Sequence, residues 1–254
     1  MSSKQVADRD KSARAVVAAI TQHRDAVEAA LTATLSPYLE RGERMPDVGL
    51  LLTLIGRRLS ALAGDLTTAD RAHERELADD PAPRQRRDEA VAAVRRIVVA
   101  LRGTVESNHG DAGLQALGLW DPPPADPSRL RLYGEALVES LLGDDVVLPA
   151  PESDAIAFDR AKLARRLRAP LDALADALAD VTREEKEADT TQLTKNAAMN
   201  AHDHAFPRLA GLLAALARAV GLDDLAARMR PSGRRAGVLA EPDEPAPAPE
   251  PSAD

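Results

Sequence analysis

Residues 163–181 read LARRLRAPLDALADALADV, and this stretch decides the fold of the chain. Its large apolar side chains recur at steps of three or four residues, and they are Leu163, Leu167, Leu171, Leu174, Leu178 and Val181. Steps of this length place all of them on one face of an α-helix, with charged residues on the opposite face. The stretch therefore predicts an amphipathic helix that packs this face against other helices.

The same periodicity recurs along the chain, and proline or glycine separates the periodic segments. It predicts helices over residues 4–40, 46–80, 84–108, 126–142, 158–205 and 208–220, and a short helix over 223–229. Pro37 is expected to kink or end the first of these helices, and Pro207 to separate the fifth from the sixth. Residues 50–55, LLLTLI, are apolar on nearly every side, so we expect them to be buried from more than one direction.

Composition agrees with close packing of helices against helices. The chain contains only 2 Phe, 2 Tyr and 1 Trp, whereas a sheet with covering helices or a ligand pocket normally uses more aromatic side chains. We therefore predict an all-α fold, an elongated antiparallel bundle of about six helices. Residues 1–235 are expected to form a single domain, and residues 236–254, acidic and rich in proline, a disordered tail.

An offset of 115 residues aligns two parts of the predicted bundle. The residues at positions 94, 98, 101 and 105 then fall on those at 209, 213, 216 and 220, all of them Val or Leu. A true duplication would make two related helical-hairpin halves, 1–109 and 126–230, joined by the loop 110–125. The other interpretation is coincidence, because any two amphipathic helices can be aligned in this way.

Charge and cysteine content limit the classes of partner. The net charge is −8, and there is no cysteine for a disulfide, a thiol nucleophile or a thiolate metal site. The first ten residues lack the apolar core of a signal peptide, and no apolar run is long enough to cross a membrane. We expect a cytoplasmic protein without a membrane partner. Nucleic acid is not an expected partner, because no aromatic residue lies within an arginine cluster.

A polar layer is the main candidate site. Two apolar stripes turn polar part-way along their helices, at Asp70 and His73 in one and at Glu185 in the other. If these side chains lie inside the bundle, buried charge of this kind must be paired or metal-bound. Alternatively the helices extend beyond the core there and these side chains are solvated, which the charged run Glu184–Asp189 favours.

The histidines do not form a recognised metal motif. Glu106 and His109 have the spacing that di-iron bundles use, but no second Glu-x-x-His exists, and a place at a helix C-terminus suits His109 better. His202 and His204 are two residues apart and face different ways on a helix, so we expect a surface or capping role. We therefore assign no catalytic residue, no metal ligand and no cofactor.

The sequence favours a non-enzymatic helical-bundle protein that acts as a scaffold or in protein–protein interaction. Self-association through an exposed heptad seam is one route, and the outward faces of the helices over 4–40 and 158–205 are the expected contact surfaces. A small-molecule partner is not expected. The alternative is a ferritin-like or small-ligand-binding bundle with its polar interior at Asp70, His73 and Glu185.

Overall fold

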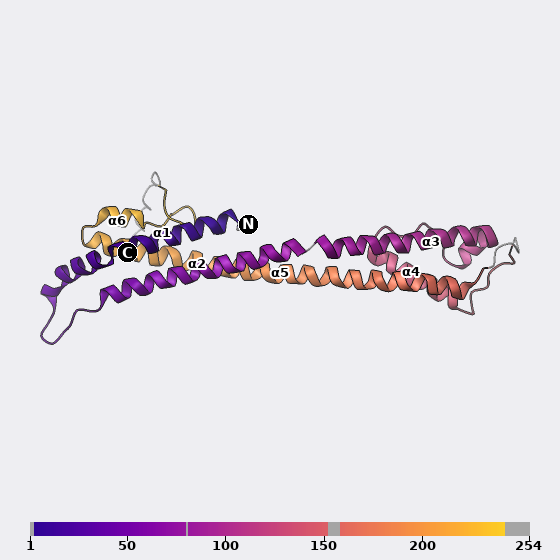
Figure 1. The fold of residues 1–254 in the computed structure, drawn as a ribbon, viewed down its shortest axis with the longest axis horizontal. Coiled ribbons are helices and arrows are strands. Elements are labelled where there is room, and N and C mark those ends of the chain that lie inside the picture. Colours follow the sequence, from indigo (N-terminus) through magenta and orange to yellow (C-terminus); the bar gives the residue numbers. More distant parts are fainter. Residues whose placement is uncertain (1–2, 80, 152–157, 242–254) are drawn as a thin grey trace, which may run out of the picture. The chain divides into compact units, whose positions relative to one another are not determined.

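A computed structural model describes residues 3–79, 81–151 and 158–241 of the chain. Figure 1 shows its helices in chain order, from indigo to yellow. They are α1 (Lys4–Leu35), the 3₁₀ helix η1 (Ser36–Tyr38), α2 (Val48–Asp79), α3 (Pro81–Ala116), α4 (Pro127–Leu142), α5 (Arg160–Ala219) and α6 (Asp223–Arg228). The one bridge of β type in these ranges joins Pro231 to Leu239. The predicted all-α bundle is confirmed.

The chain divides into two compact units, and α2 and α5 contribute residues to both. The first unit comprises Met1–Arg75 and Asp189–Asp254, and the second comprises Glu76–Ala188. These boundaries fall inside α2 and α5, and they differ from those of the halves 1–109 and 126–230. Duplication stays a prediction, as does a single domain over 1–235. None of the helices in the described ranges combines the length and the apolar composition that a bilayer-spanning segment needs.

In the first unit α1 and α2 form an antiparallel hairpin. Gly56 lies opposite Ile20 and Gly49 lies opposite Glu28, so residue numbers rise along one helix as they fall along the other. The C-terminal part of α5 packs on this hairpin. The buried core includes Val16, Ile20, Val27 and Leu31 of α1, Leu52, Ile55 and Leu59 of α2, and Phe206, Ala210 and Leu213 of α5.

The second unit has its own apolar core, built from α3, α4 and the N-terminal part of α5. It includes Val94, Val98, Leu101 and Val105 of α3, Leu130, Leu137 and Leu141 of α4, and Leu167, Leu171 and Leu174 of α5. Gly134 lets α4 approach α5 closely, because a Cβ at this position would collide with the side chain of Leu171. The predicted stripes of the third and fifth helices therefore face this core.

The expected break at Pro207 is wrong, since α5 continues through it from Arg160 to Ala219. Pro207 has no N–H to donate to the carbonyl four residues earlier, which normally costs about 3 kcal/mol in a helix interior. Phe206, Ala210 and Leu213 on either side are buried in the core of the first unit. Burial of this face on both sides of the proline offsets the lost hydrogen bond.

The end of the third helix and the start of the tail also differ from the predicted ones. The third helix extends to Ala116 because Gly110, with φ 58°, allows a non-helical step within α3 that returns to helix. Part of the predicted tail is folded: Val238 is buried, and Leu239 donates its backbone N–H to the Oγ of Ser12 at 3.2 Å. The remainder of the predicted tail, 242–254, lies outside the described residues.

Candidate functional site

The buried carboxylate of Asp70 is the centre of a polar layer in the first unit. Asp70 lies on α2 and is fully buried. Its Oδ1 is 2.7 Å from the Nζ of Lys195 on α5, and its Oδ2 accepts a hydrogen bond of 2.9 Å from the backbone N–H of Ser3. An uncompensated carboxylate in this position would cost several kcal/mol. The ammonium group of Lys195 and the start of α1 compensate it.

His73 lies one turn further along α2 and is also buried. Its Nδ1 is 3.0 Å from the Oγ1 of Thr191, which lies one turn before Lys195 on α5. Glu185, the third residue of the predicted layer, is exposed and belongs to the other unit. Of the two interpretations of these residues, exposure to solvent is therefore correct for Glu185, and burial inside the bundle is correct for Asp70 and His73.

The contacts within this polar layer indicate that it has a structural role. Its carboxylate is paired with an ammonium group and a backbone N–H, and its imidazole is next to a hydroxyl. The rule that buried charge needs a partner predicts that such a partner exists, but does not identify it. Lys195 is one of only five lysines in the chain. This scarcity is the one signal in the sequence that could have pointed to it.

A second buried polar cluster surrounds His202 of α5. The His202 side chain is fully buried and stacks on Phe206, with 5.3 Å between ring centroids. The neighbouring Asp203 forms a two-bond ion pair with Arg9 of α1, each bond 2.7 Å long. Burial lowers the pKa of the His202 imidazole below its ordinary value, while the nearby Asp203 carboxylate acts in the opposite direction.

Gly237 closes this cluster from the C-terminal segment. A Cβ on Gly237 would collide with Oδ1 of Asp203 and lie 2.9 Å from Nδ1 of His202. The predicted surface role of His202 is therefore wrong, because a segment far along the chain covers this face of α5. His204 is exposed, as the spacing of two residues requires.

His109 packs against other residues of the second unit, and its contacts are those of a structural residue. It directly precedes the non-helical Gly110, its Nδ1 is 2.9 Å from the backbone oxygen of Pro149, and its ring meets that of Phe158 edge-on at 5.1 Å. Glu106 is exposed, whereas His109 is buried. The two side chains therefore do not converge on a common ligand position.

Three carboxylates of the second unit lie close together, those of Glu76, Glu184 and Glu187. Their oxygens lie within 4.8 Å of one another. Arg183 supplies a guanidinium group to this cluster, 3.5 Å from Glu184 and 3.9 Å from Glu187. Such carboxylates on partly exposed helix faces are common without a bound ion, so the cluster carries no functional assignment.

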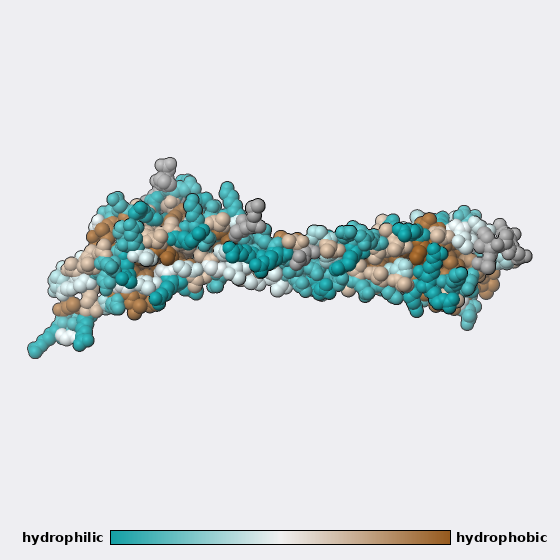
Figure 2. All heavy atoms as spheres, viewed as in Figure 1, coloured by the Kyte–Doolittle hydropathy of each residue, from teal (hydrophilic) through white to brown (hydrophobic). Residues whose placement is uncertain are grey.

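The first unit also has an exposed apolar surface where α1 and α2 join. In the apolar stretch 50–55, Leu52 and Ile55 are buried, whereas Leu50, Leu51 and Leu54 are about half exposed. The expectation that this stretch is buried from several directions is therefore wrong. We define the turn patch as the large apolar side chains exposed at this end of the hairpin. They are Leu35, Tyr38, Leu39, Leu50, Leu51 and Leu54. Figure 2 shows hydrophilic atoms, in teal, at the tip of this turn and separate small areas of apolar atoms, in brown, beside it.

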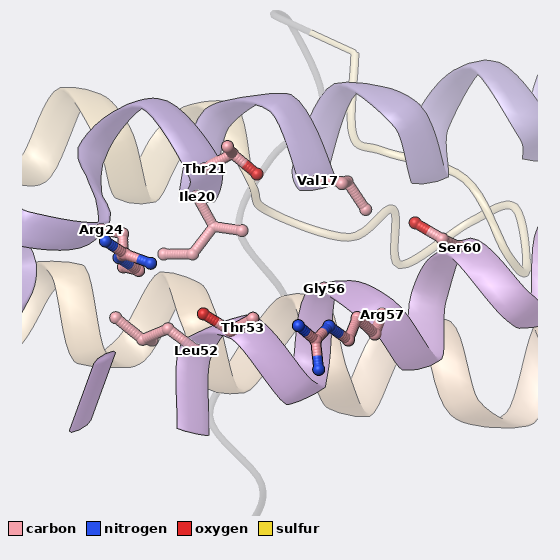
Figure 3. Close-up of a pocket in the computed structure, with 9 residues that line it drawn as sticks. All are labelled: Val17, Ile20, Thr21, Arg24, Leu52, Thr53, Gly56, Arg57 and Ser60. Carbon is pink, nitrogen blue, oxygen red and sulfur yellow. The ribbon is translucent and has the colours of Figure 1, made fainter. Parts of the chain in front are cut away.

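A groove runs between α1 and α2 along the same hairpin. Figure 3 shows its first part, where Ile20 and Leu52 lie between the helices and Arg24 and Arg57 come from opposite sides. This part of the groove has a volume of about 300 Å³. A second part, of about 750 Å³, continues toward Gly64 and shares Val17, Thr21 and Ser60 with the first.

Comparison of the chain with family models, with curated proteins and with solved structures finds no match.

Proposed function

We propose that this protein is a non-enzymatic scaffold that associates with a second copy of itself through the turn patch. The observation that carries the proposal is the exposure of Leu50, Leu51 and Leu54, in a helical segment whose apolar residues surround the helix axis. The first unit covers only one side of that segment. A cytoplasmic location is part of the proposal.

The size of the turn patch supports an interface. Tyr38 is 81% exposed, and five leucines each expose between a third and a half of their surface. Together these side chains present on the order of a few hundred Å² of apolar surface, about the size of the largest apolar patch on a typical monomeric protein, and such patches are often functional. A stable interface buries about 800 Å² on each partner. The patch can therefore supply the apolar centre of such an interface, with the polar residues around it as the rim.

The charge of that rim favours a second copy as the occupant. The turn between η1 and α2 contains Glu40, Arg41, Glu43 and Arg44, and all four side chains are exposed. In a two-fold symmetric interface the same surface occurs on both partners, so acidic and basic residues within one patch can pair with each other across the axis. A strongly acidic or basic partner would leave half of these charges opposite a like charge.

The buried polar layer does not favour the alternative of a ligand-binding bundle. A small-ligand site in the interior needs polar groups that turn toward a cavity. Here the carboxylate of Asp70 is paired with Lys195 and Ser3, and His73 is next to Thr191. These groups hold α1, α2 and α5 together within the first unit, which is the role that a scaffold requires of its interior.

The molar mass of the chain in solution tests the proposal. We expect light scattering on a sizing column to give a mass that rises from one chain to two with concentration. The double variant Leu50→Glu, Leu54→Glu should stay at the mass of one chain and keep its helical circular dichroism, because both side chains are exposed. The matched control is Leu193→Glu, which changes a leucine that is 69% exposed on α5 and should still dimerise.

A mass of one chain for the wild type at all concentrations would overturn the proposal. A dimer that survives the double variant would also overturn it, since the interface would then lie elsewhere.

A further inference from the structure

The buried imidazole of His202 lacks hydrogen bonds. Its side chain is fully buried, and neither Nδ1 nor Nε2 has a hydrogen-bond partner among the described residues. Oδ1 of Asp203 is 3.5 Å from Nδ1, which is longer than an ordinary hydrogen bond. The charged form of histidine has two N–H groups that need acceptors. A site of this kind therefore favours the neutral imidazole.

The charged groups of α5 and α1 near His202 are already paired. The carboxylate of Asp203 accepts two hydrogen bonds of 2.7 Å from the guanidinium group of Arg9. Asp10, on the same helix as Arg9, forms an ion pair with Arg14. Protonation of His202 would add a positive charge beside carboxylates that each have a guanidinium partner.

The helix α2 adds no buried charge at this level. Asp70 of α2 meets Lys195, which lies two turns before His202 on the antiparallel α5. Counting seven residues along each helix places His202 near Ala63 of α2, and Ala63 is buried. The charged residue of α2 closest to Ala63 in sequence, Asp65, is exposed. An added charge on His202 would therefore face an apolar part of α2.

A C-terminal hairpin covers the Nδ1 edge of the imidazole. We define this hairpin as residues 231–239, whose ends are joined by the antiparallel bridge between Pro231 and Leu239. Gly237 lies over His202, since a Cβ at this position would be 2.9 Å from Nδ1. Gly237 and Val238 are buried, whereas the charged residues of the hairpin, Arg234 and Arg235, are exposed. The hairpin therefore separates His202 from water without offering it a charged partner.

The hairpin can leave the helices as a unit. It has hydrogen bonds of its own, among them one of 2.9 Å from the backbone N–H of Ser232 to the carbonyl of Val238. It contacts α1 through the hydrogen bond from Leu239 to Ser12, and it buries the side chain of Val238. By contrast, α1 buries six residues on one face. Lifting the hairpin therefore admits water to His202 with less loss of apolar burial than moving α1.

We infer that protonation of His202 releases the C-terminal hairpin from α1 and α5. Neutral His202 tolerates the cover, because it needs no counter-ion. The imidazolium group gains hydrogen bonds to water when the hairpin leaves, and these replace the acceptors that the closed site does not supply. The hairpin is thus a cover whose position depends on the protonation state of one buried side chain.

Release becomes more favourable as the pH falls. Burial holds the pKa of His202 below its ordinary value while the hairpin is in place, and release returns the pKa toward about 6.5. The released form therefore binds more protons in the interval between these two pKa values. Within this interval the equilibrium constant for release should rise by up to about tenfold for each pH unit of acidification. Above the interval it should not depend on His202.

A spin label on the hairpin tests the inference with the full chain. The chain has no cysteine, so Ala236→Cys provides a single labelling site at an exposed position of the hairpin. The electron paramagnetic resonance spectrum of the nitroxide should gain a mobile component as the pH is lowered from 8 to 5. Ala61→Cys, at an exposed position of α2 in the same unit, is the matched control and should keep one unchanged spectrum.

Two variants identify the titrating group. His202→Leu and His202→Gln do not titrate, and in either background the label at position 236 should show the same spectrum at pH 8 and pH 5. His204→Leu changes the exposed histidine of the same helix and should leave the transition as in the wild type. Circular dichroism confirms that each variant is folded, and His202→Gln supplies the test if His202→Leu is not.

Three results would overturn the inference. One is a hairpin label whose mobility is the same at pH 8 and pH 5. Another is a transition that persists in a folded variant of His202. The third is a simultaneous rise in mobility at positions 61 and 236, because the whole first unit would then be unfolding and the hairpin would not be released by itself.

Discussion

The Nζ of Lys195 lies 2.7 Å from the Oδ1 of Asp70, and this ion pair joins α5 to α2 inside the first unit. The carboxylate is fully buried and the side chain of Lys195 is only 12% exposed. A buried pair of this kind contributes little compared with an apolar pair of the same shape. Removing only one of the two charged groups is strongly destabilising, because the other charge then stays unpaired in a medium of low dielectric constant.

We therefore expect Lys195→Met to lower the free energy of unfolding by about 3–5 kcal/mol, the usual cost of breaking a buried ion pair from one side. Lys11→Met, at an exposed lysine of α1, should change it by less than about 0.5 kcal/mol. Urea unfolding measures both. The double variant Asp70→Asn, Lys195→Met should be less destabilised than the sum of the two single variants. Strict additivity would show that the pair is not coupled.

The pH dependence of stability should report His202. Because burial holds the pKa of His202 below the ordinary value of about 6.5, the unfolded chain binds more protons than the folded chain between the lowered pKa and pH 6.5. The free energy of unfolding should therefore fall as the pH is lowered through this window. The contribution of His202 is at most about 1.4 kcal/mol per pH unit.

His202→Leu should flatten this dependence, since leucine occupies the buried position without titrating. His204→Leu, which changes the exposed histidine of the same helix, should leave the slope as in the wild type. The measurement is urea unfolding at several pH values between 5 and 8. An unchanged slope in His202→Leu would assign the pH dependence to other groups.

Gly237→Ala should destabilise the first unit for two reasons. The position has φ +71°, which costs an L-residue roughly 1–2 kcal/mol, and the new Cβ would collide with Oδ1 of Asp203. Gly221→Ala is a matched control, because Gly221 has φ +77° but no atom within 4 Å of an added Cβ. The difference in unfolding free energy between the two variants measures the collision alone. Tryptic cleavage after Arg234 or Arg235 should become faster only in Gly237→Ala.

Arg160 should be important for the second unit, because its guanidinium group closes the C-terminal end of α4. It donates hydrogen bonds of 2.7–3.1 Å to four backbone carbonyls, at positions 140, 141, 143 and 146. Arg160→Ala removes these donors at once, and we expect a loss of about 2–4 kcal/mol in unfolding free energy. Arg165→Ala, at an exposed arginine one turn further along α5, should have almost no effect on thermal unfolding. Equal melting temperatures of the two variants would contradict this role.

The positions of the helices followed from the sequence because their causes are local. The spacing of Leu167, Leu171 and Leu174 is enough to predict both a helix and its buried face, and these residues lie in the core. The N-cap at Asp126, whose carboxylate accepts the backbone N–H of Arg129, also has a local cause, because Asp is a preferred N-cap residue. The continuation of α5 through Pro207 was not predictable, because a rule based on neighbouring residues does not include the burial of Phe206 and Ala210 on either side.

The polar layer was predictable in part. The burial of Asp70 and His73 follows from their place on the apolar stripe of α2. Glu185 was expected at the same height on α5, whereas the contact residues are Thr191 and Lys195. The difference is one of register. The spacing within a helix follows from its own residues, but the residue that it meets on another helix depends on how the two cores pack.

By itself the sequence determined that this chain is all-α, where most of its helices begin and end, and which residues have apolar surfaces to bury, since each of these depends on residues within a few turns. Only the tertiary structure decided which surfaces are covered. Lys195 reaches Asp70 and Gly237 covers His202 because segments far apart in the chain pack together. Leu50 and Leu54 stay exposed because no helix in the described part of the first unit packs over them.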